Sequence, residues 1–93
     1  MISLDQVVRR NEKTASRVLV GEAIVLTPHD SKIHSFNETG SRIWELLAEE
    51  PTVEEVVAQI RGEFEVSEEQ AQADVTAFLE ELAAKGMVTL GQR

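Results

Sequence analysis

The chain has 93 residues, no cysteine and a formal net charge of −8. A chain of this length forms one domain and buries only about 60–65% of its unfolded surface, which leaves little room for a deep catalytic cavity. The absence of cysteine excludes disulfides, thiolate metal sites and thiol nucleophiles, and it favours a cytoplasmic location. The chain also lacks a signal-peptide pattern and any run near the ~20 apolar residues of a membrane span, so no membrane association is expected.

The charge is unevenly distributed between the two parts of the chain. Residues 1–36 carry five basic and four acidic side chains, a net of +1, whereas residues 37–93 carry four basic and thirteen acidic ones, a net of −9. Nucleic-acid binding draws much of its affinity from basic side chains that neutralise phosphates. We therefore expect no nucleic-acid partner, and a basic peptide or another protein fits the charge better.

The first third of the chain is typical of a small antiparallel sheet. Residues 17–20 and 23–27 predict two strands joined at Gly21-Glu22, because glycine tolerates the positive φ that a hairpin turn needs. Turn-forming residues occupy 28–31, and Lys32–Phe36 follows as a third strand. Residues 1–14 read as an N-terminal arm, although Val7-Val8 could begin a strand, and residues 91–93 read as a C-terminal tail.

Three helices are predicted after the sheet, each with a recognisable start. Asn37 is a candidate N-cap for a helix that ends near Ala48, before Pro51. Capping boxes at 52–55 and 67–70 predict the second and third helices, and Gly86 is placed to end the third. The fold class expected is α+β, winged helix-turn-helix-like, with a three-stranded antiparallel sheet followed by three helices.

Catalytic and metal-binding chemistry finds little support in the sequence. His29 and His34 lack a carboxylate at a spacing that would complete a metal site, and His34 is expected to point opposite to Ile33, away from the core. Paired glutamates such as Glu54-Glu55 are better explained as solvated helix starts than as general acids and bases. No nucleophile elbow and no glycine-rich phosphate loop is present, so an enzyme is not expected.

Two features remain as candidates for binding. Trp44, the only tryptophan, reads as a core residue, with a ligand-facing ring as the alternative. The strand Lys32–Phe36 would leave unpaired N–H and C=O groups at a sheet edge, where an extended peptide could pair. The alternative is that residues 87–90, a short extended segment, cover that edge.

Several segments of the chain resemble the PqqD family. They are the run Phe-Asn-Glu-Thr-Gly-Ser-Arg-Ile-Trp-Glu-Leu-Leu at residues 36–47, then Thr52–Glu55, Ala73–Val75, Phe78-Leu79, Leu82 and Gly86–Val88. These proteins are peptide chaperones of pyrroloquinoline quinone (PQQ) biosynthesis and related precursor-peptide recognition elements. The similarity covers roughly residues 15–90, and the asparagine-threonine-glycine helix start followed by isoleucine-tryptophan is its most specific part.

The resemblance implies a domain without catalysis or cofactor of its own. It would bind the leader of a ribosomally made precursor peptide as an added strand, in a groove between the third strand and the third helix. It would then present the peptide to a modifying enzyme, often a radical S-adenosylmethionine (SAM) enzyme. The candidate peptide-binding residues are Lys32, Ile33, His34, Ser35 and Phe36 on the strand and Asp74, Val75, Phe78 and Leu79 on the helix.

Two alternatives of other classes stay open at this stage. One is a small winged-helix regulator that binds DNA, which the acidic helical part disfavours. The other is an adaptor whose free strand edge pairs with a second copy to form a homodimer.

Overall fold

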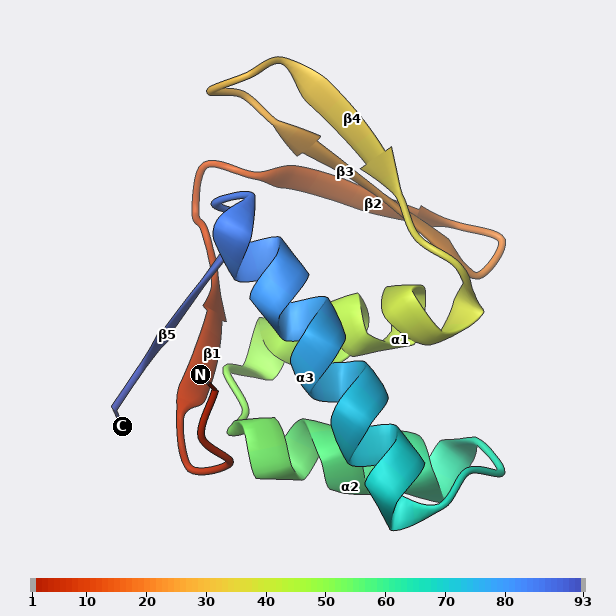
Figure 1. Ribbon diagram of the computed structural model, residues 1–93. Coiled ribbons are helices and arrows are strands. Elements are labelled where there is room, and N and C mark those ends of the chain that lie inside the picture. Colours follow the sequence, from red (N-terminus) through yellow and green to blue (C-terminus); the bar gives the residue numbers. More distant parts are fainter. Residues whose placement is uncertain (1, 93) are drawn as a thin grey trace.

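The computed structural model describes residues 2–92, and its elements follow in chain order (Figure 1). They are β1 (Val7–Arg10), β2 (Ala15–Leu19), β3 (Glu22–Thr27), β4 (Lys32–Ser35), α1 (Glu38–Leu46), a short 3₁₀ helix (Leu47–Glu49), α2 (Val53–Glu63), α3 (Glu68–Ala84) and β5 (Val88–Gly91). The mixed α+β fold, with an antiparallel three-stranded sheet before three helices, is as the sequence predicts.

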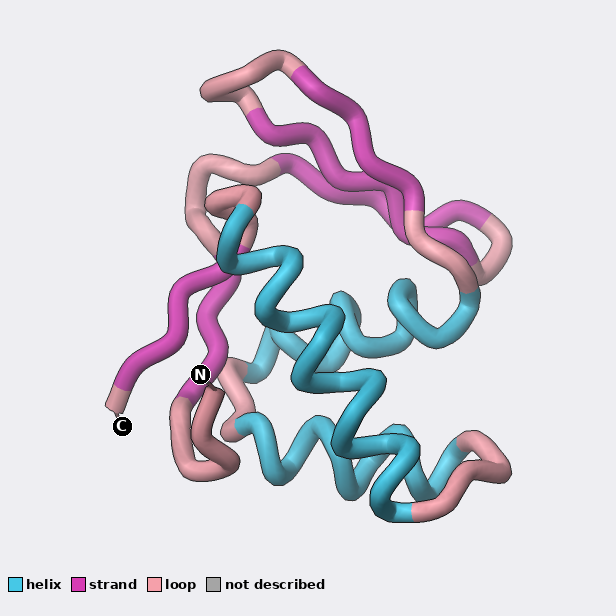
Figure 2. The backbone as a smooth tube through the Cα atoms, viewed as in Figure 1, coloured by secondary structure: helices cyan, strands magenta, loops and turns pink. Residues whose placement is uncertain are grey.

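The strands form two separate antiparallel sheets (Figure 2). One is the meander β2-β3-β4, in which β3 is central. The other pairs β1 with β5, the first and last strands of the described chain. All three helices lie on one side of the meander, and α3 runs from the α2 side of the molecule toward it (Figure 1).

The strand β1 corrects the expectation of an arm over residues 1–14. Val7 and Val8 are buried, and the whole strand pairs with β5 from Val7↔Gly91 to Arg10↔Val88. The charged stretch misleads because Arg10 covers a buried ring: its guanidinium lies 4.6 Å from the centroid of Trp44. A long cationic side chain can bury its stem and still pack in this way.

The position of the C-terminal strand shows whether residues 87–90 cover the β4 edge of the meander. α3 ends in a Schellman motif, in which Gly86 has φ +73 and the N–H of Met87 donates to the carbonyl of Leu82 at 2.9 Å. The chain then turns into β5 beside β1. Residues 87–90 therefore do not cover β4, and that alternative is excluded.

The core lies between the meander and the three helices. It contains the buried residues of α1, α2 and α3 together with Ala23 and Val25 of β3. Trp44 is fully buried, which settles it as a core residue. Within residues 2–92, no helix is both long and apolar enough to span a membrane.

Candidate functional site

The outer edge of β4 is unpaired by any strand of the described chain, because the sheet order is β2-β3-β4. The N–H of Phe36 donates to the carbonyl of Ala23 at 3.0 Å, which fixes the phase of the hydrogen-bond ladder. In an antiparallel pair, successive residues alternate between facing the partner strand and facing away. The backbone N–H and C=O groups of Ile33 and Ser35 therefore point outward, toward the free edge.

Ser41 holds the end of this edge in place. Its buried hydroxyl accepts a hydrogen bond from the N–H of Ala23 at 2.7 Å and donates one to the carbonyl of Phe36 at 3.1 Å. The hydroxyl thereby replaces a ladder bond at the point where β4 leaves β3. Nothing in the local sequence singles out Ser41, because a serine in the first turn of a helix usually reads as a surface residue.

The start of α1 explains the asparagine-threonine-glycine motif. Asn37 has extended backbone and its side chain accepts from the N–H of Gly40 at 2.8 Å, as an N-cap does. A Cβ added at Gly40 would lie 3.2 Å from atoms of Asn37, Phe36 and Phe78. A larger residue here would press on the end of β4 and the middle of α3, so those side chains would have to shift by a few tenths of an ångström.

The side chains of β4 alternate with the opposite phase to the one expected. Ile33 is 72% exposed, whereas His34 is half-buried and its Nε2 lies 3.2 Å from the hydroxyl of the buried Thr27. The register pairs His34 with buried Val25 and Ile33 with Leu26, which faces outward. Phe36, and not Ile33, therefore shares its face with the core, and His34 lies on that inner face.

The turn between β3 and β4 is fixed by Asp30. Thr27 donates to its carboxylate at 2.5 Å, and the backbone N–H of Lys32 donates at 3.2 Å. The hydrogen bond from Thr27 is the main cause that holds the pKa of Asp30 below its usual value. The first residue of the edge strand is thus held against the turn.

Helix α3 supplies the second wall beside β4. The ring of Phe78 packs edge-on against Phe36 with centroids 5.2 Å apart, and Phe36 in turn lies 6.0 Å from Trp44. Asp74 lies one turn before Phe78 and is exposed, and its carboxylate accepts from the side chain of Gln70 at 2.8 Å. Phe78 therefore packs at the end of the edge strand, and Asp74 lies one turn away on the same helix.

The remaining two helix candidates lie elsewhere. Val75 and Leu79 are fully buried in the core, where no ligand in the groove can touch them. A hollow of about 230 Å³ separates the start of α1 from α3, and its lining residues are Asn37, Thr39, Gly40, Ile43, Asp74 and Phe78. Of the four residues predicted on α3, Asp74 and Phe78 line this hollow beside the start of α1, and Phe78 also packs on Phe36, the residue that follows β4.

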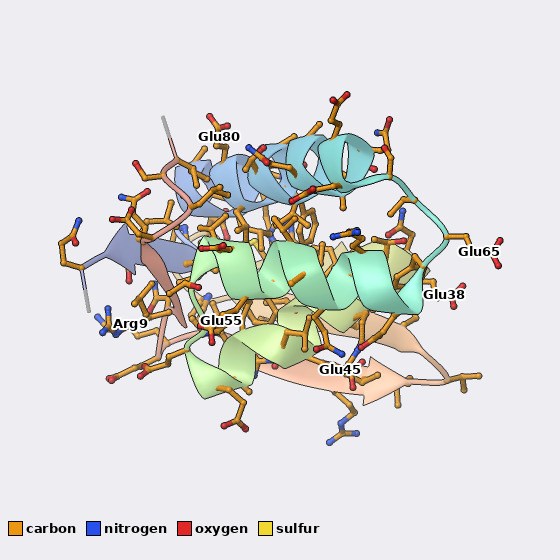
Figure 3. The ribbon with its side chains drawn as sticks, turned by 90° about the horizontal axis from the view of Figure 1, so that it is seen from below. Arg9, Glu38, Glu45, Glu55, Glu65 and Glu80 are labelled. Carbon is orange, nitrogen blue, oxygen red and sulfur yellow. The ribbon has the colours of Figure 1, made fainter. Side chains whose placement is uncertain are left out.

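The helical side of the molecule is acidic, and its glutamates mostly face solvent. Glu65 and Glu80, for example, point away from the body of the molecule (Figure 3). Glu63 differs because Arg42 of α1 contacts it through two hydrogen bonds of 2.7 and 2.8 Å. These bonds, together with a hydrogen bond from the side chain of Gln59, lower the pKa of Glu63 to about 2, and the ion pair joins α1 to α2.

No group of three or more metal-ligating side chains is gathered within residues 2–92. The site offers a strand edge with free backbone groups, a neighbouring apolar ring and a carboxylate at its rim. Such an arrangement can bind an extended chain through its backbone and select side chains through the flanking groove. The fold and site define a small winged-helix-like domain with an accessible edge strand.

Comparison with known proteins places this domain in a family. The chain belongs to the PqqD family: the family model described as coenzyme PQQ synthesis protein D matches residues 22–88. No curated protein matches the chain.

Two solved structures share the fold. One is TbiB1 in complex with the TbiA(beta) leader peptide, which is 29% identical, with a TM-score of 0.82 over 86% of this chain and 93% of that one. The other is lasso peptide synthetase B1 complexed with the leader peptide, at 20% identity and a TM-score of 0.79, over 88% of this chain and 96% of that one.

Proposed function

We propose that this protein is a non-enzymatic recognition element that binds the leader region of a ribosomally made precursor peptide. The peptide adds as a strand to the outer edge of β4, where the backbone groups of Ile33 and Ser35 are free. This free edge, next to Phe78 and Asp74, is the observation that carries the proposal. Membership of the PqqD family and the leader-peptide complexes of two proteins of similar fold support it.

The two walls of the site have different roles in this proposal. Backbone pairing with β4 supplies affinity with little demand on sequence, because every residue but proline carries the same groups. Inward-pointing side chains of the peptide enter the space beside Phe36 and Phe78, so the groove selects apolar residues there. Lys32, His34 and Asp74 flank the path and add polar contacts.

The bound peptide is then presented to an enzyme that modifies it. A radical SAM enzyme is one class of partner that the family resemblance suggests, and the domain itself supplies neither cofactor nor catalytic group. The chain would act by holding one end of the substrate at the enzyme, which raises the local concentration of the segment to be modified.

A displayed library of random peptides tests the proposal without knowledge of the natural precursor. Selection on the purified chain, with counter-selection on an Ile33→Pro variant, should enrich extended peptides with apolar residues at alternate positions. A library that yields no peptide specific to the unmodified chain would contradict the proposal. The variant supplies the matched control, because it removes one outward N–H and leaves the helices unchanged.

A further inference from the structure

The outer face of the meander is the main apolar surface of the described chain. Six large hydrophobic side chains are exposed within residues 2–92. Leu19, Leu26 and Ile33 lie on this face and Val20 lies at its hairpin tip, whereas Val18 lies on the opposite face, across from buried Ala23, and Leu4 lies outside the sheet. The helices all lie on the other side (Figure 1). The register places Ala15, Leu26 and Ile33 in one row across the three strands.

This face is slightly hollowed and is not explained by folding. Residues of all three strands line a hollow of about 270 Å³: Ala15, Ser16, Arg17, Ile24, Leu26 and Ile33. At the hairpin tip, Val20 is fully exposed with φ +50, a conformation that β-branched residues rarely adopt. Turn geometry would favour Asn or Gly at this position, so neither the core nor the turn accounts for the valine.

We propose that this outer sheet face is an interface between two copies of the chain. A two-fold contact brings the same patch together twice, so the patch must be complementary to itself. Two charged side chains of opposite sign lie on it, Arg17 and Glu22, at diagonal positions on the paired strands β2 and β3. A two-fold axis through the patch lets Arg17 of each copy face Glu22 of the other.

The charge of the rest of the molecule also favours the sheet face, over the helical side, as the contact between two copies. Residues 37–93 carry a net charge of −9, so contact between the helical sides of two copies would bring like charges together. Residues 15–36, which form the meander, carry two basic and two acidic side chains, a net charge of zero. The sheet face is therefore the side on which two copies can approach with the least repulsion.

The size of the face indicates how strong the contact is. Three strands about 4.8 Å apart, with up to six residues at about 3.4 Å each, cover roughly 300 Å². A stable interface buries about 800 Å² on each partner, so this face alone supplies less than half of that area. The dimer is accordingly weak and forms as the protein concentration rises.

Sedimentation velocity from micromolar to millimolar concentration tests the interface with the protein alone. We expect the unmodified chain to shift from monomer toward dimer. Leu26→Glu, at the centre of the face, should weaken association by about tenfold or more. Leu4→Glu is the matched control, because Leu4 lies outside this sheet and is 37% exposed, against 39% for Leu26; it should leave the association unchanged.

A charge exchange separates this face from other contacts. Arg17→Glu and Glu22→Arg should each weaken association, and the double variant should restore it, because the two charges meet across the axis. Circular dichroism confirms that each variant is folded, and both positions are exposed enough to tolerate the change.

Two results would overturn the inference. One is a chain that stays monomeric at every concentration, which would leave the face to a different protein. The other is association that survives both Leu26→Glu and Arg17→Glu, which would place the contact elsewhere, such as the β4 edge. The inference does not depend on peptide binding, which uses that edge and the opposite side of the sheet.

Discussion

Replacing Ile33 with proline removes one outward N–H from the β4 edge. The ladder to β3 is preserved, because that N–H points away from β3, and proline is tolerated on edge strands for this reason. The exposed side chain contributes little to the core, since Ile33 is 72% exposed. The change therefore acts on the backbone that the peptide would use.

The expected loss follows from the bond that disappears. One backbone hydrogen bond contributes about 0.5–1.5 kcal/mol, and the peptide carbonyl left facing the proline ring loses its partner as well. A total of about 1–2 kcal/mol corresponds to a 5- to 30-fold weaker affinity. Fluorescence polarisation with a labelled peptide from the library selection measures this difference directly.

Two companion variants show which part of Ile33 matters. Ile33→Ala keeps the N–H and should bind the peptide nearly as well as the unmodified chain. His34→Pro removes an N–H that faces β3 and should destabilise the sheet itself. The reasoning would be refuted if Ile33→Pro melted normally and bound the peptide with unchanged affinity.

Three further outcomes follow from the same contacts. Ser41→Ala leaves two backbone groups without partners and should lower the free energy of unfolding by about 2–3 kcal/mol in urea titrations, and a change under 0.5 kcal/mol would contradict the bridging role. Glu63→Gln should lower the melting temperature at pH 7, and the difference from the unmodified chain should shrink as pH falls from 4.5 toward 2. The reason is that the pKa of Glu63 is lower in the folded than in the unfolded chain, so the stabilisation is lost when the carboxylate is protonated. A difference independent of pH would argue against the ion pair. Val75→Asp should abolish the cooperative melt followed by circular dichroism, since it buries an unpaired charge, whereas Asp74→Asn should melt normally; a stable Val75→Asp would contradict the placement of Val75 in the core.

The sequence predicts structure correctly where residues close together in the chain determine it. The cap at Asn37 and the capping box at Thr52 with Glu55 form as predicted, because each depends on residues three positions apart. At Ser67 only half of the predicted box forms: Gln70 donates its backbone N–H to Ser67 but turns its side chain to Asp74. The spacing of the residues does not determine whether the side chain of Gln70 turns back to Ser67 or forward to Asp74.

Contacts between segments far apart in the chain could not be predicted from local sequence patterns. The strand β1 is stabilised by pairing with β5, some 80 residues later, and by the stacking of Arg10 on Trp44, neither of which leaves a local trace. Val75 and Phe78 belong to one apolar stripe in the sequence. Only the position of β4 beside α3 separates the core residue from the one that faces the groove.

The phase of β4 differs from the predicted one for a related reason. The sequence predicts that apolar Ile33 points inward, but the inward face is set by Thr27 and Val25 of the neighbouring strand. A four-residue strand with one isoleucine carries too little alternation to fix its own phase.

Hydrogen exchange at the β4 amides tests the central claim most directly. Binding of a selected peptide should slow exchange at Ile33 and Ser35, whose N–H groups face the free edge. The amide of His34 faces β3 and should change much less. A peptide that binds while exchange at Ile33 and Ser35 stays as fast as in the free protein would contradict strand addition at this edge.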